Sequence, residues 1–255
     1  MSCVNIRGCC IGEGRPKVII PIVEPTEAAI LEKAAEFSTL RADCVEWRID
    51  CFEGAKDFPT IVHCAAKLRV ALKDKLLLFT FRTKAEGGKV ALSHEEYLHF
   101  IRVVLATDCA DLIDIEFFTA GAELPALIEE AHTAGAAVVC SSHDFAKTPP
   151  RAELVCRMVQ MQQAGADLPK LAVMPHTPAD TARLLEATAQ AAAATGNDTP
   201  LITMSMGQQG MVSRICGAAF GSCAGFATAG VSSAPGQPAA PALRTALDAL
   251  GAMLG

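Results

Sequence analysis

Short apolar runs recur along the chain, and segments with helical periodicity separate them. Eight of the runs have the length and residue types of β-strands: KVIIPIV, DCVEWRID, KLLLFTFR, DLIDIEFF, AAVVCSSHD, PKLAVMP, LITMSMG and GFATAG. The segments between them predict helices at Glu27–Thr39, Thr60–Leu72, His94–Ala106, Glu123–Thr133, Arg151–Gln163, Pro178–Ala194, Met211–Phe220 and Ala240–Met253. The chain therefore alternates strictly between strand and helix.

Units of this kind favour a closed barrel of parallel strands over an open doubly wound sheet. The length of 255 residues is ordinary for such a barrel, and no Pro/Gly/Ser-rich linker divides the chain. We predict an α/β fold, a (β/α)8 TIM barrel that forms a single domain over residues 1–255. The segment Val4–Ile11 is expected to add a short β-hairpin-like cap before the first barrel strand.

Charged residues occupy one face of several predicted strands. In EWRID, alternation places Glu46, Arg48 and Asp50 on the face opposite to Trp47. One strand face of a closed barrel packs on the helices, and the other points inward, where polar groups near the carboxyl ends of the strands form active sites. The same alternation predicts inward positions for Thr80, Arg82, Asp114 and Glu116.

Several charges inside one barrel must neutralise one another, because a buried charge is costly unless it is paired. We interpret the deeper acids as a structural ion network, namely Asp50, Asp114 and Glu116. For three other residues we favour contact with a ligand: Glu46, Arg48 and Arg82.

One lysine lies on a predicted strand that otherwise has no charge. Lys170 begins KLAVMP, on the same face as Ala172 and Met174. A lysine amine attacks a ketone only in its neutral form, and burial beside cations such as Arg48 and Arg82 favours that form. The position predicts Schiff-base chemistry; the alternative is a lysine that only neutralises barrel carboxylates.

A histidine lies at the carboxyl end of the fifth predicted strand. This residue, His143 in SSHDF, is well placed there for proton transfer at neutral pH. Glu86 belongs to the Gly-rich segment FRTKAEGG after the third strand and can reach back to orient the imidazole. A loop glutamate is otherwise usually solvated.

Two loops at the same end of the predicted barrel carry groups suited to an anion. Arg214 follows the seventh strand, and Ser233 and Gln237 lie in SSAPGQ after the eighth. Loops at these positions commonly hold anionic groups in barrels. A phosphate and a carboxylate fit equally well, and SSAPGQ alone is also compatible with an ordinary turn.

Composition excludes several classes of function. The net charge of -6 is spread without basic blocks, so we expect no nucleic-acid partner. No apolar run has the length of a membrane span and the N-terminus lacks the apolar core of a signal peptide, so we expect no membrane partner and a cytoplasmic location. No nucleotide-binding glycine motif and no metal-ligand spacing occur, so neither a cofactor nor a metal is expected.

The eleven cysteines include no C-x-x-C pair. We interpret them as reduced thiols that fill the core, with Cys44, Cys64, Cys140 and Cys156 inside apolar stretches. The adjacent residues Cys9 and Cys10 receive no role from this interpretation.

Taken in order, these segments resemble a known family. The stretches EWRID, LLFTFRTKAEGG, DLIDIEFF, SSHDF-x-KTP, GADLPKLAVMP, ITMSMG-x-x-G-x-x-SR and SAPGQ look like those of type I 3-dehydroquinate dehydratase of the shikimate pathway. The resemblance runs from about KVII to the last helix. It implies a homodimeric β/α barrel that dehydrates 3-dehydroquinate to 3-dehydroshikimate through an imine, without a cofactor.

The resemblance also implies roles for individual residues. Lys170 would condense with the C3 ketone, and His143, assisted by Glu86, would remove the C2 proton and protonate the departing C1 hydroxyl. Arg214, Ser233 and Gln237 would hold the substrate carboxylate. The full set of implied substrate-binding residues is Glu46, Trp47, Arg48, Arg82, Arg214, Ser233, Gln237, Met204, Met206 and Phe226, the last three as apolar walls.

The chain departs from the family pattern at two positions. Pro21 ends the first strand where many members have a serine that contacts substrate, and Ala146 replaces a polar residue after HDF. Proline can donate no hydrogen bond, so one substrate contact is in question. Two other hypotheses stay open: a class I Schiff-base aldolase for a phosphorylated sugar, and a non-catalytic barrel that only binds its ligand.

Overall fold

The computed structural model describes residues 3–196 and 198–254, and its central element is an eight-stranded parallel sheet. Its strands are β3 (Lys17–Ile22), β4 (Cys44–Arg48), β5 (Leu76–Thr80), β6 (Leu112–Glu116), β7 (Ala137–Asp144), β8 (Leu168–Val173), β9 (Ile202–Ser205) and β10 (Ala224–Phe226). Neighbours in the sheet are neighbours in the chain, and β10 pairs with β3. An isolated bridge between Leu201 and Ser222 joins the ends of β9 and β10, so the barrel is nearly closed.

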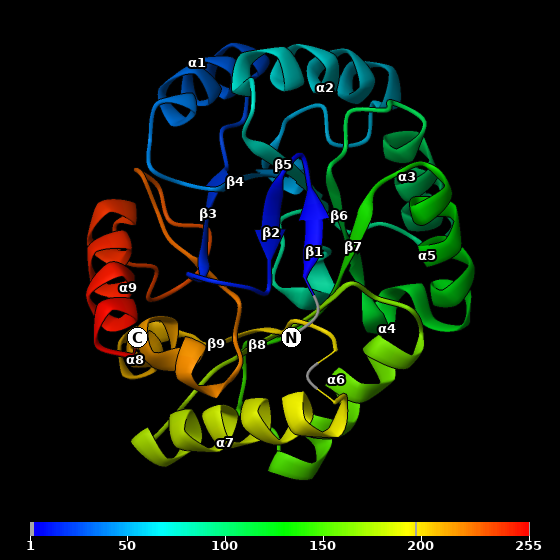
Figure 1. Ribbon diagram of the computed structural model, residues 1–255. Helices are drawn as coiled ribbons and strands as arrows, with labels where there is room; N and C mark the ends of the chain where they lie inside the picture. Colours follow the sequence, from blue (N-terminus) through cyan, green and yellow to red (C-terminus); the bar gives the residue numbers. More distant parts are fainter. Residues whose placement is uncertain (1–2, 197, 255) are drawn as a thin grey trace.

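Helices surround the barrel in the order of the chain (Figure 1). They are α1 (Glu27–Ser38), α2 (Phe58–Leu72), α3 (His94–Leu105), α5 (Leu124–Thr133), α6 (Arg151–Gln163), α7 (Pro178–Ala194), α8 (Gly207–Cys216) and α9 (Ala240–Leu254). N-terminal caps fix where some of these helices begin. The Thr26 side chain accepts from the Ala29 amide at the start of α1, and Ser93 and Glu96 form a capping box at the start of α3. The predicted (β/α)8 architecture is confirmed.

Short elements were not predicted, because a single turn has no periodicity. They are α4 (Phe117–Ala120) and the 3₁₀ turns η1 (Ile49–Cys51), η2 (Lys84–Glu86), η3 (Gly121–Glu123) and η4 (Gly217–Phe220). Helix α8 begins at Gly207 rather than Met211 because GQQG has no apolar stripe. A Cβ at Gly210 would lie 2.3 Å from the Ser205 carbonyl carbon, so close helix–strand packing requires glycine there.

The predicted N-terminal cap is present as the antiparallel hairpin β1 (Val4–Ile6) and β2 (Cys9–Ile11). In Figure 1 it lies in front of the ring of strands, and Ile11 packs on the apolar layer that fills this end of the barrel. Arg7, in its turn, pairs with Asp111 at 2.5 Å. The barrel interior is thus apolar at the hairpin end, which leaves the polar residues to the other end.

Two cysteine predictions were wrong. Cys3 and Cys10 are joined by a disulfide on the hairpin, and Cys156 is exposed on α6 because its position faces away from the barrel. Cys44, Cys64 and Cys140 are buried, as predicted.

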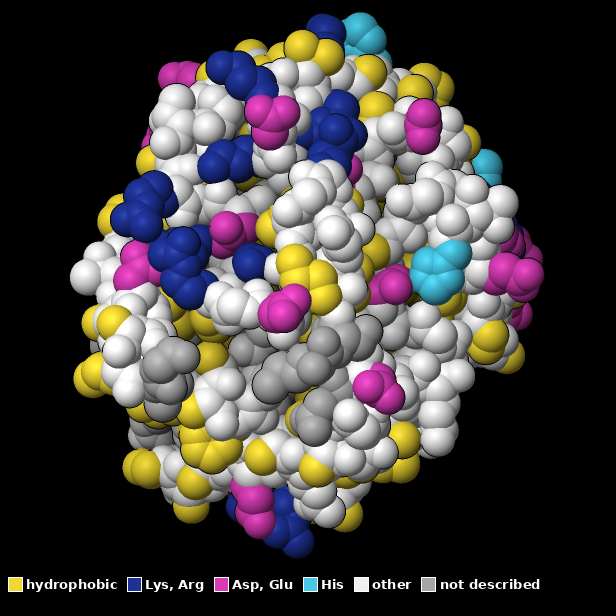
Figure 2. All heavy atoms as spheres, viewed as in Figure 1, with side chains coloured by type: hydrophobic (Ala, Val, Ile, Leu, Met, Phe, Trp, Pro, Cys, Tyr) yellow, Lys and Arg dark blue, Asp and Glu magenta, His cyan; other side chains and the backbone are white. Residues whose placement is uncertain are grey.

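The surface at the hairpin end carries mixed charge. Figure 2 shows basic and acidic side chains interspersed with apolar ones on this face. Among the described helices, none is both long enough and apolar enough to cross a membrane.

Candidate active site

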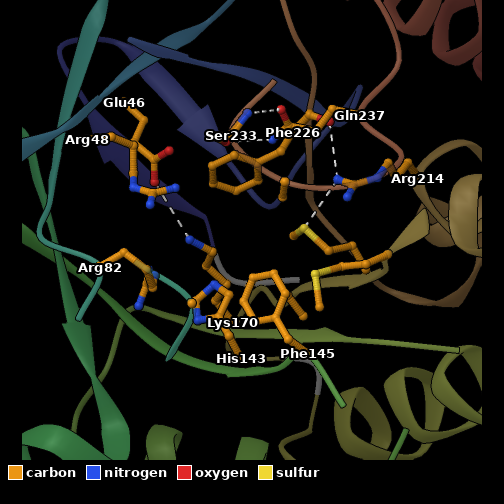
Figure 3. Close-up of a pocket in the computed structure, with 15 residues that line it drawn as sticks. Glu46, Arg48, Arg82, His143, Phe145, Lys170, Arg214, Phe226, Ser233 and Gln237 are labelled. Atoms are coloured by element: carbon orange, nitrogen blue, oxygen red, sulfur yellow. Dashed lines mark hydrogen bonds and ion pairs between the residues drawn. The ribbon is translucent and has the colours of Figure 1, made fainter. Parts of the chain in front are cut away.

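A pocket of about 440 Å³ opens at the carboxyl ends of the barrel strands. Figure 3 shows side chains converging on it, among them Lys170 from β8, His143 from β7 and Arg214 from helix α8. The lining residues are Glu46, Arg48, Arg82, Gly87, His143, Phe145, Lys170, Ala172, Met204, Met206, Arg214, Phe226, Ser233, Ala234 and Gln237. This is the end of a β/α barrel at which active sites form.

Lys170 lies at the floor of the pocket with a side chain only 3% exposed. Its Nζ donates to Asp114 Oδ2 at 3.0 Å, lies 3.9 Å from Glu46 Oε1, and sits 4.4 Å from the centroid of the Phe226 ring. Thr80 holds Glu46 in place by donating to Oε1 at 2.9 Å. The amine is therefore paired with carboxylates, whereas the sequence had suggested cations as its electrostatic neighbours.

The two arginines beside Lys170 are each neutralised by an acid. Arg48 donates from Nε and Nη2 to Asp50 at 2.8 and 2.9 Å, and Arg82 donates to Asp114 and Glu116 at 2.8 Å each. Burial opposes the charge on Arg82, but these carboxylates hold the pKa of its guanidinium above the ordinary value. The acids interpreted as a structural network do make such a network, and Asp114 contacts Lys170 as well.

His143 and Glu86 form a direct pair. Nδ1 of His143 lies 2.9 Å from Glu86 Oε2, which also accepts from the His143 amide at 3.0 Å. Two glycines allow the turn that brings Glu86 back to His143. Gly87 ends η2 in the left-handed region with φ of 88°, and a Cβ at Gly88 would lie 1.8 Å from the Arg82 carbonyl oxygen, so both positions require glycine. Because Nδ1 contacts Glu86, Nε2 is the ring nitrogen that is available for proton transfer.

The environment displaces both pKa values of this pair. Burial lowers the pKa of His143 well below 6.5, and the positive charges of Arg82, Lys170 and Arg48 act in the same direction. Burial raises the pKa of Glu86 to about 8, against the attraction of Arg82. The imidazole is therefore neutral at neutral pH and available as a base.

Arg214 is a buried cation that makes no ion pair with any residue the structure describes. Its Nη1 lies 3.3 Å from both Met204 Sδ and the Phe226 carbonyl oxygen, and Nε has no hydrogen-bond partner within the described part of the chain. Burial lowers the pKa of this guanidinium to about 10. A buried arginine with free donors at a pocket wall is a receptor for an anion.

The loop after β10 brings polar groups beside Arg214. Gln237 Oε1 accepts from the Ser233 amide at 3.0 Å, and its Nε2 donates to Ser233 Oγ at 2.9 Å. The loop is anchored on α8, since the Gly207 amide donates to the Pro235 carbonyl at 3.1 Å. At Gly236, with φ of +74°, a Cβ would lie 2.3 Å from the Gly207 carbonyl oxygen, so this close approach requires glycine.

Trp47 is the one predicted substrate contact that the structure does not bring into the pocket. It is fully buried on the opposite face of β4, where its ring packs on Phe52 and Phe79 with centroids 5.9 and 5.7 Å away. Strand alternation explains the error, because Glu46 and Arg48 point inward and the residue between them must point outward.

Replacing Trp47 by alanine should therefore lower stability rather than substrate affinity. Loss of a fully buried tryptophan typically costs about 3–5 kcal/mol of unfolding free energy. Urea unfolding measures that loss, and KM, measured at a temperature where the variant is folded, should stay within about twofold of the parent value because no pocket atom is removed. A large rise in KM with little loss of stability would contradict this placement.

Phe145 lines the pocket but was not predicted to do so. Its ring stacks with that of His143 at a centroid distance of 6.5 Å and covers Gly87, where a Cβ would lie 2.3 Å from the ring. Phe145 lies in the loop directly after β7, where no periodicity predicts which way a side chain points. The one sequence signal for a place in the pocket was that Phe145 is two residues after His143 in SSHDF. Pro21 is buried and does not line the pocket.

Comparison with known proteins gives a consistent result over nearly the whole chain. Residues 18–253 match the family model of type I 3-dehydroquinase. The 3-dehydroquinate dehydratase of Bacillus licheniformis is 46% identical over 97% of both chains, and that of Bacillus subtilis is 44% identical over 98% of both. The structure of type I 3-dehydroquinate dehydratase from Clostridium difficile, solved with covalently modified comenic acid, superposes with a TM-score of 0.95 at 38% identity, covering 99% of this chain and 100% of that one. With the fold, the motifs and full-length similarity in agreement, the chain belongs to the type I 3-dehydroquinase family.

Proposed function

We propose that this protein dehydrates 3-dehydroquinate to 3-dehydroshikimate through a Schiff base on Lys170. Family membership supports the overall reaction, a step of the shikimate pathway. The observation that carries the mechanism is a buried lysine amine in the same pocket as His143, whose Nδ1 is held by Glu86 behind the pocket wall. A nucleophilic amine beside a positioned acid–base group is what imine-mediated elimination requires.

In the first step, neutral Lys170 Nζ attacks the C3 ketone and the carbonyl oxygen leaves as water. The protonated imine then withdraws electrons from C2, which makes the C2 proton acidic. His143 Nε2 takes that proton, and the resulting enamine expels the C1 hydroxyl, which leaves as water after His143 returns the proton. Hydrolysis of the imine releases product and restores the amine. The lysine supplies the electron sink, so this route calls for no cofactor.

Arg214, Ser233 and Gln237 bind the substrate carboxylate in this proposal. The unpaired guanidinium supplies the charge, and the two loop residues supply neutral donors. Glu46, Arg48 and Arg82 would contact the ring hydroxyls, and Met204, Met206 and Phe226 would pack on the ring. This assembly orients the substrate before chemistry begins.

Product formation tests the proposed reaction. Incubation with 3-dehydroquinate should produce the ultraviolet absorbance of a conjugated product. If no such absorbance develops, phosphorylated sugars are the next substrates to assay, since a class I aldolase also uses a barrel lysine. Arg214 is the one strong cation among the lining residues near the loops after β9 and β10, which favours a carboxylate over a doubly charged phosphate.

Activity should decline on the acidic side only below pH 6.5. His143 acts as a base when neutral, so turnover is present above its folded pKa and is lost as pH falls through it. Because burial and the neighbouring cations lower that pKa, the acidic limb of the kcat profile lies below the ordinary value of 6.5. A profile of kcat from pH 5 to 9 measures this limb. An acidic limb above pH 7 would contradict the assignment.

Replacing Arg214 by alanine should chiefly weaken substrate binding. A charge-assisted hydrogen bond contributes about 1.5–3 kcal/mol, which corresponds to a rise in KM of about 10- to 150-fold. Steady-state kinetics compare this variant with Arg183→Ala, whose arginine pairs with Asp180 on α7 and does not line the pocket. Equal KM values for the parent and the Arg214 variant would reject the carboxylate clamp.

We further propose that the chain acts as a single-domain, cytoplasmic homodimer. The continuous sheet supports one domain, and family resemblance supports the dimer. The thiols of Cys44, Cys64 and Cys140 stay free and buried, which suits a reducing compartment, whereas the disulfide of Cys3 with Cys10 lies on the N-terminal hairpin outside the barrel. Light scattering of the purified protein gives the mass that distinguishes monomer from dimer.

A further inference from the structure

We propose that Asp114 is a positioning residue for the reaction, acting as the fixed counter-ion of the protonated imine on Lys170. This inference rests on the proposed function. It assigns to Asp114 a part in the chemistry beyond the structural ion network that its depth in the barrel suggests.

The contacts of Asp114 fix one oxygen against the reacting nitrogen. Oδ2 accepts from Lys170 Nζ at 3.0 Å and from Arg82 Nη2 at 2.8 Å, while Oδ1 accepts from Ser141 Oγ at 2.6 Å. The carboxylate is fully buried. Because Lys170, Arg82 and Ser141 all bind this carboxylate, its position is fixed. It therefore defines where the Lys170 nitrogen lies.

Charged or titratable groups from four other strands surround the Lys170 nitrogen. They are Glu46 and Arg48 on β4, Arg82 after β5, Asp114 on β6 and His143 on β7, and β10 contributes the uncharged ring of Phe226. Of the two carboxylates among them, Glu46 is 3.9 Å away and only Asp114 is at hydrogen-bond distance. Asp114 is therefore the closest negative charge to the nitrogen.

Asp114 is also held in its ionised form. Complete burial alone would raise its pKa, but Arg82 and Lys170 hold that pKa below the ordinary value. Imine formation exchanges two N–H bonds for a C=N bond and releases water, and the nitrogen stays positive only while it keeps one proton. A fixed anion at 3.0 Å stabilises that positive form.

The variant Asp114→Asn tests this role, with Glu116→Gln as a matched control. Both acids lie on β6, both are fully buried, and both accept from Arg82 at 2.8 Å, but Lys170 contacts only Asp114. Each protein is mixed with 3-dehydroquinate and cyanoborohydride over a range of pH, and mass spectrometry measures the fraction of Lys170 that carries the reduced adduct. Circular dichroism checks that each variant is folded.

Loss of the counter-ion should move the pH dependence of trapping toward acid, because only the protonated imine is reduced readily. An opposite charge at this distance shifts a protonation equilibrium by about 10- to 1000-fold. The pH at which half of the maximal trapping is reached, called the midpoint below, should therefore fall by about 1–3 pH units in Asp114→Asn. The Glu116→Gln midpoint should move less. Equal shifts in the two variants would overturn the proposal, since they would assign the effect to Arg82, and so would an unchanged midpoint in Asp114→Asn.

A second variant keeps the test decisive if Asp114→Asn does not fold. Ser141→Ala removes the hydrogen bond that fixes Oδ1, together with the one that Ser141 Oγ accepts from Arg82 Nη1 at 3.0 Å, and keeps the carboxylate. Because the charge of Asp114 is then less tightly placed, the pH midpoint of trapping should move in the same direction by a smaller amount. An unmoved midpoint would then count against the role of Asp114. If the parent protein turns substrate over without any adduct on Lys170, the proposed imine mechanism fails first, which is a distinguishable result.

Discussion

Turnover of 3-dehydroquinate should fall by about 10⁴-fold or more when Lys170 is replaced by alanine, because removal of a covalent nucleophile abolishes the route that it opens. Without the amine no imine forms, and the C2 proton has no electron sink beside it. The ultraviolet assay measures the loss, and the variant should form no adduct with 3-dehydroquinate and borohydride.

Two comparisons make this result specific. Lys67→Ala removes a surface lysine of α2 that pairs with Glu27, and it should turn over like the parent. The fold of this variant must be checked, because Lys170→Ala leaves Asp114 with Arg82 as its one cationic partner among the described residues. Circular dichroism distinguishes lost chemistry from lost structure. A folded Lys170→Ala variant with turnover within tenfold of the parent would refute the imine mechanism.

Replacing His143 by alanine should separate imine formation from elimination. General acid–base catalysis typically contributes about 10²–10⁴-fold, so kcat should fall by that factor while Lys170 can still condense with the ketone. Borohydride should therefore trap the substrate on Lys170 in this variant even though product forms slowly. The prediction is measured by kcat and by the trapped fraction in the same sample.

His132 supplies the control for this experiment. It is exposed on α5 and pairs with Asp167 at 2.8 Å, outside the pocket, so His132→Ala should leave kcat unchanged. Unimpaired turnover in His143→Ala would remove His143 from the mechanism. Loss of both trapping and turnover would instead indicate that the imidazole is needed to form the imine.

Much of the fold was predictable because each strand and helix carries its own periodicity. Alternating charge in EWRID and LIDIEF is sufficient to predict that Glu46, Arg48 and Asp114 point into the barrel, and all three are buried there. Periodicity fails where a segment is too short or too polar, as in α4 and at the start of α8. Nor could it pair cysteines across the hairpin: the disulfide of Cys3 with Cys10 depends on the register of β1 and β2.

The composition of the site was more predictable than its electrostatics. Family motifs and strand ends together named Lys170, His143 and Glu86; the first two line the pocket, and Glu86 contacts His143. The sequence could not show that Arg82 is bound to Asp114 and Glu116, which leaves carboxylates rather than cations against Lys170. Such pairing depends on distances between neighbouring strands, which alternation within one strand does not determine.

Peptide mass spectrometry after borohydride reduction tests the central claim most directly. The parent protein is mixed with 3-dehydroquinate, reduced and digested, and the peptide that contains Lys170 is examined. The imine mechanism predicts that this peptide, and no other lysine peptide, gains the mass of the reduced ligand while product accumulates in an unreduced sample. Product formation with an unmodified Lys170 peptide would contradict it.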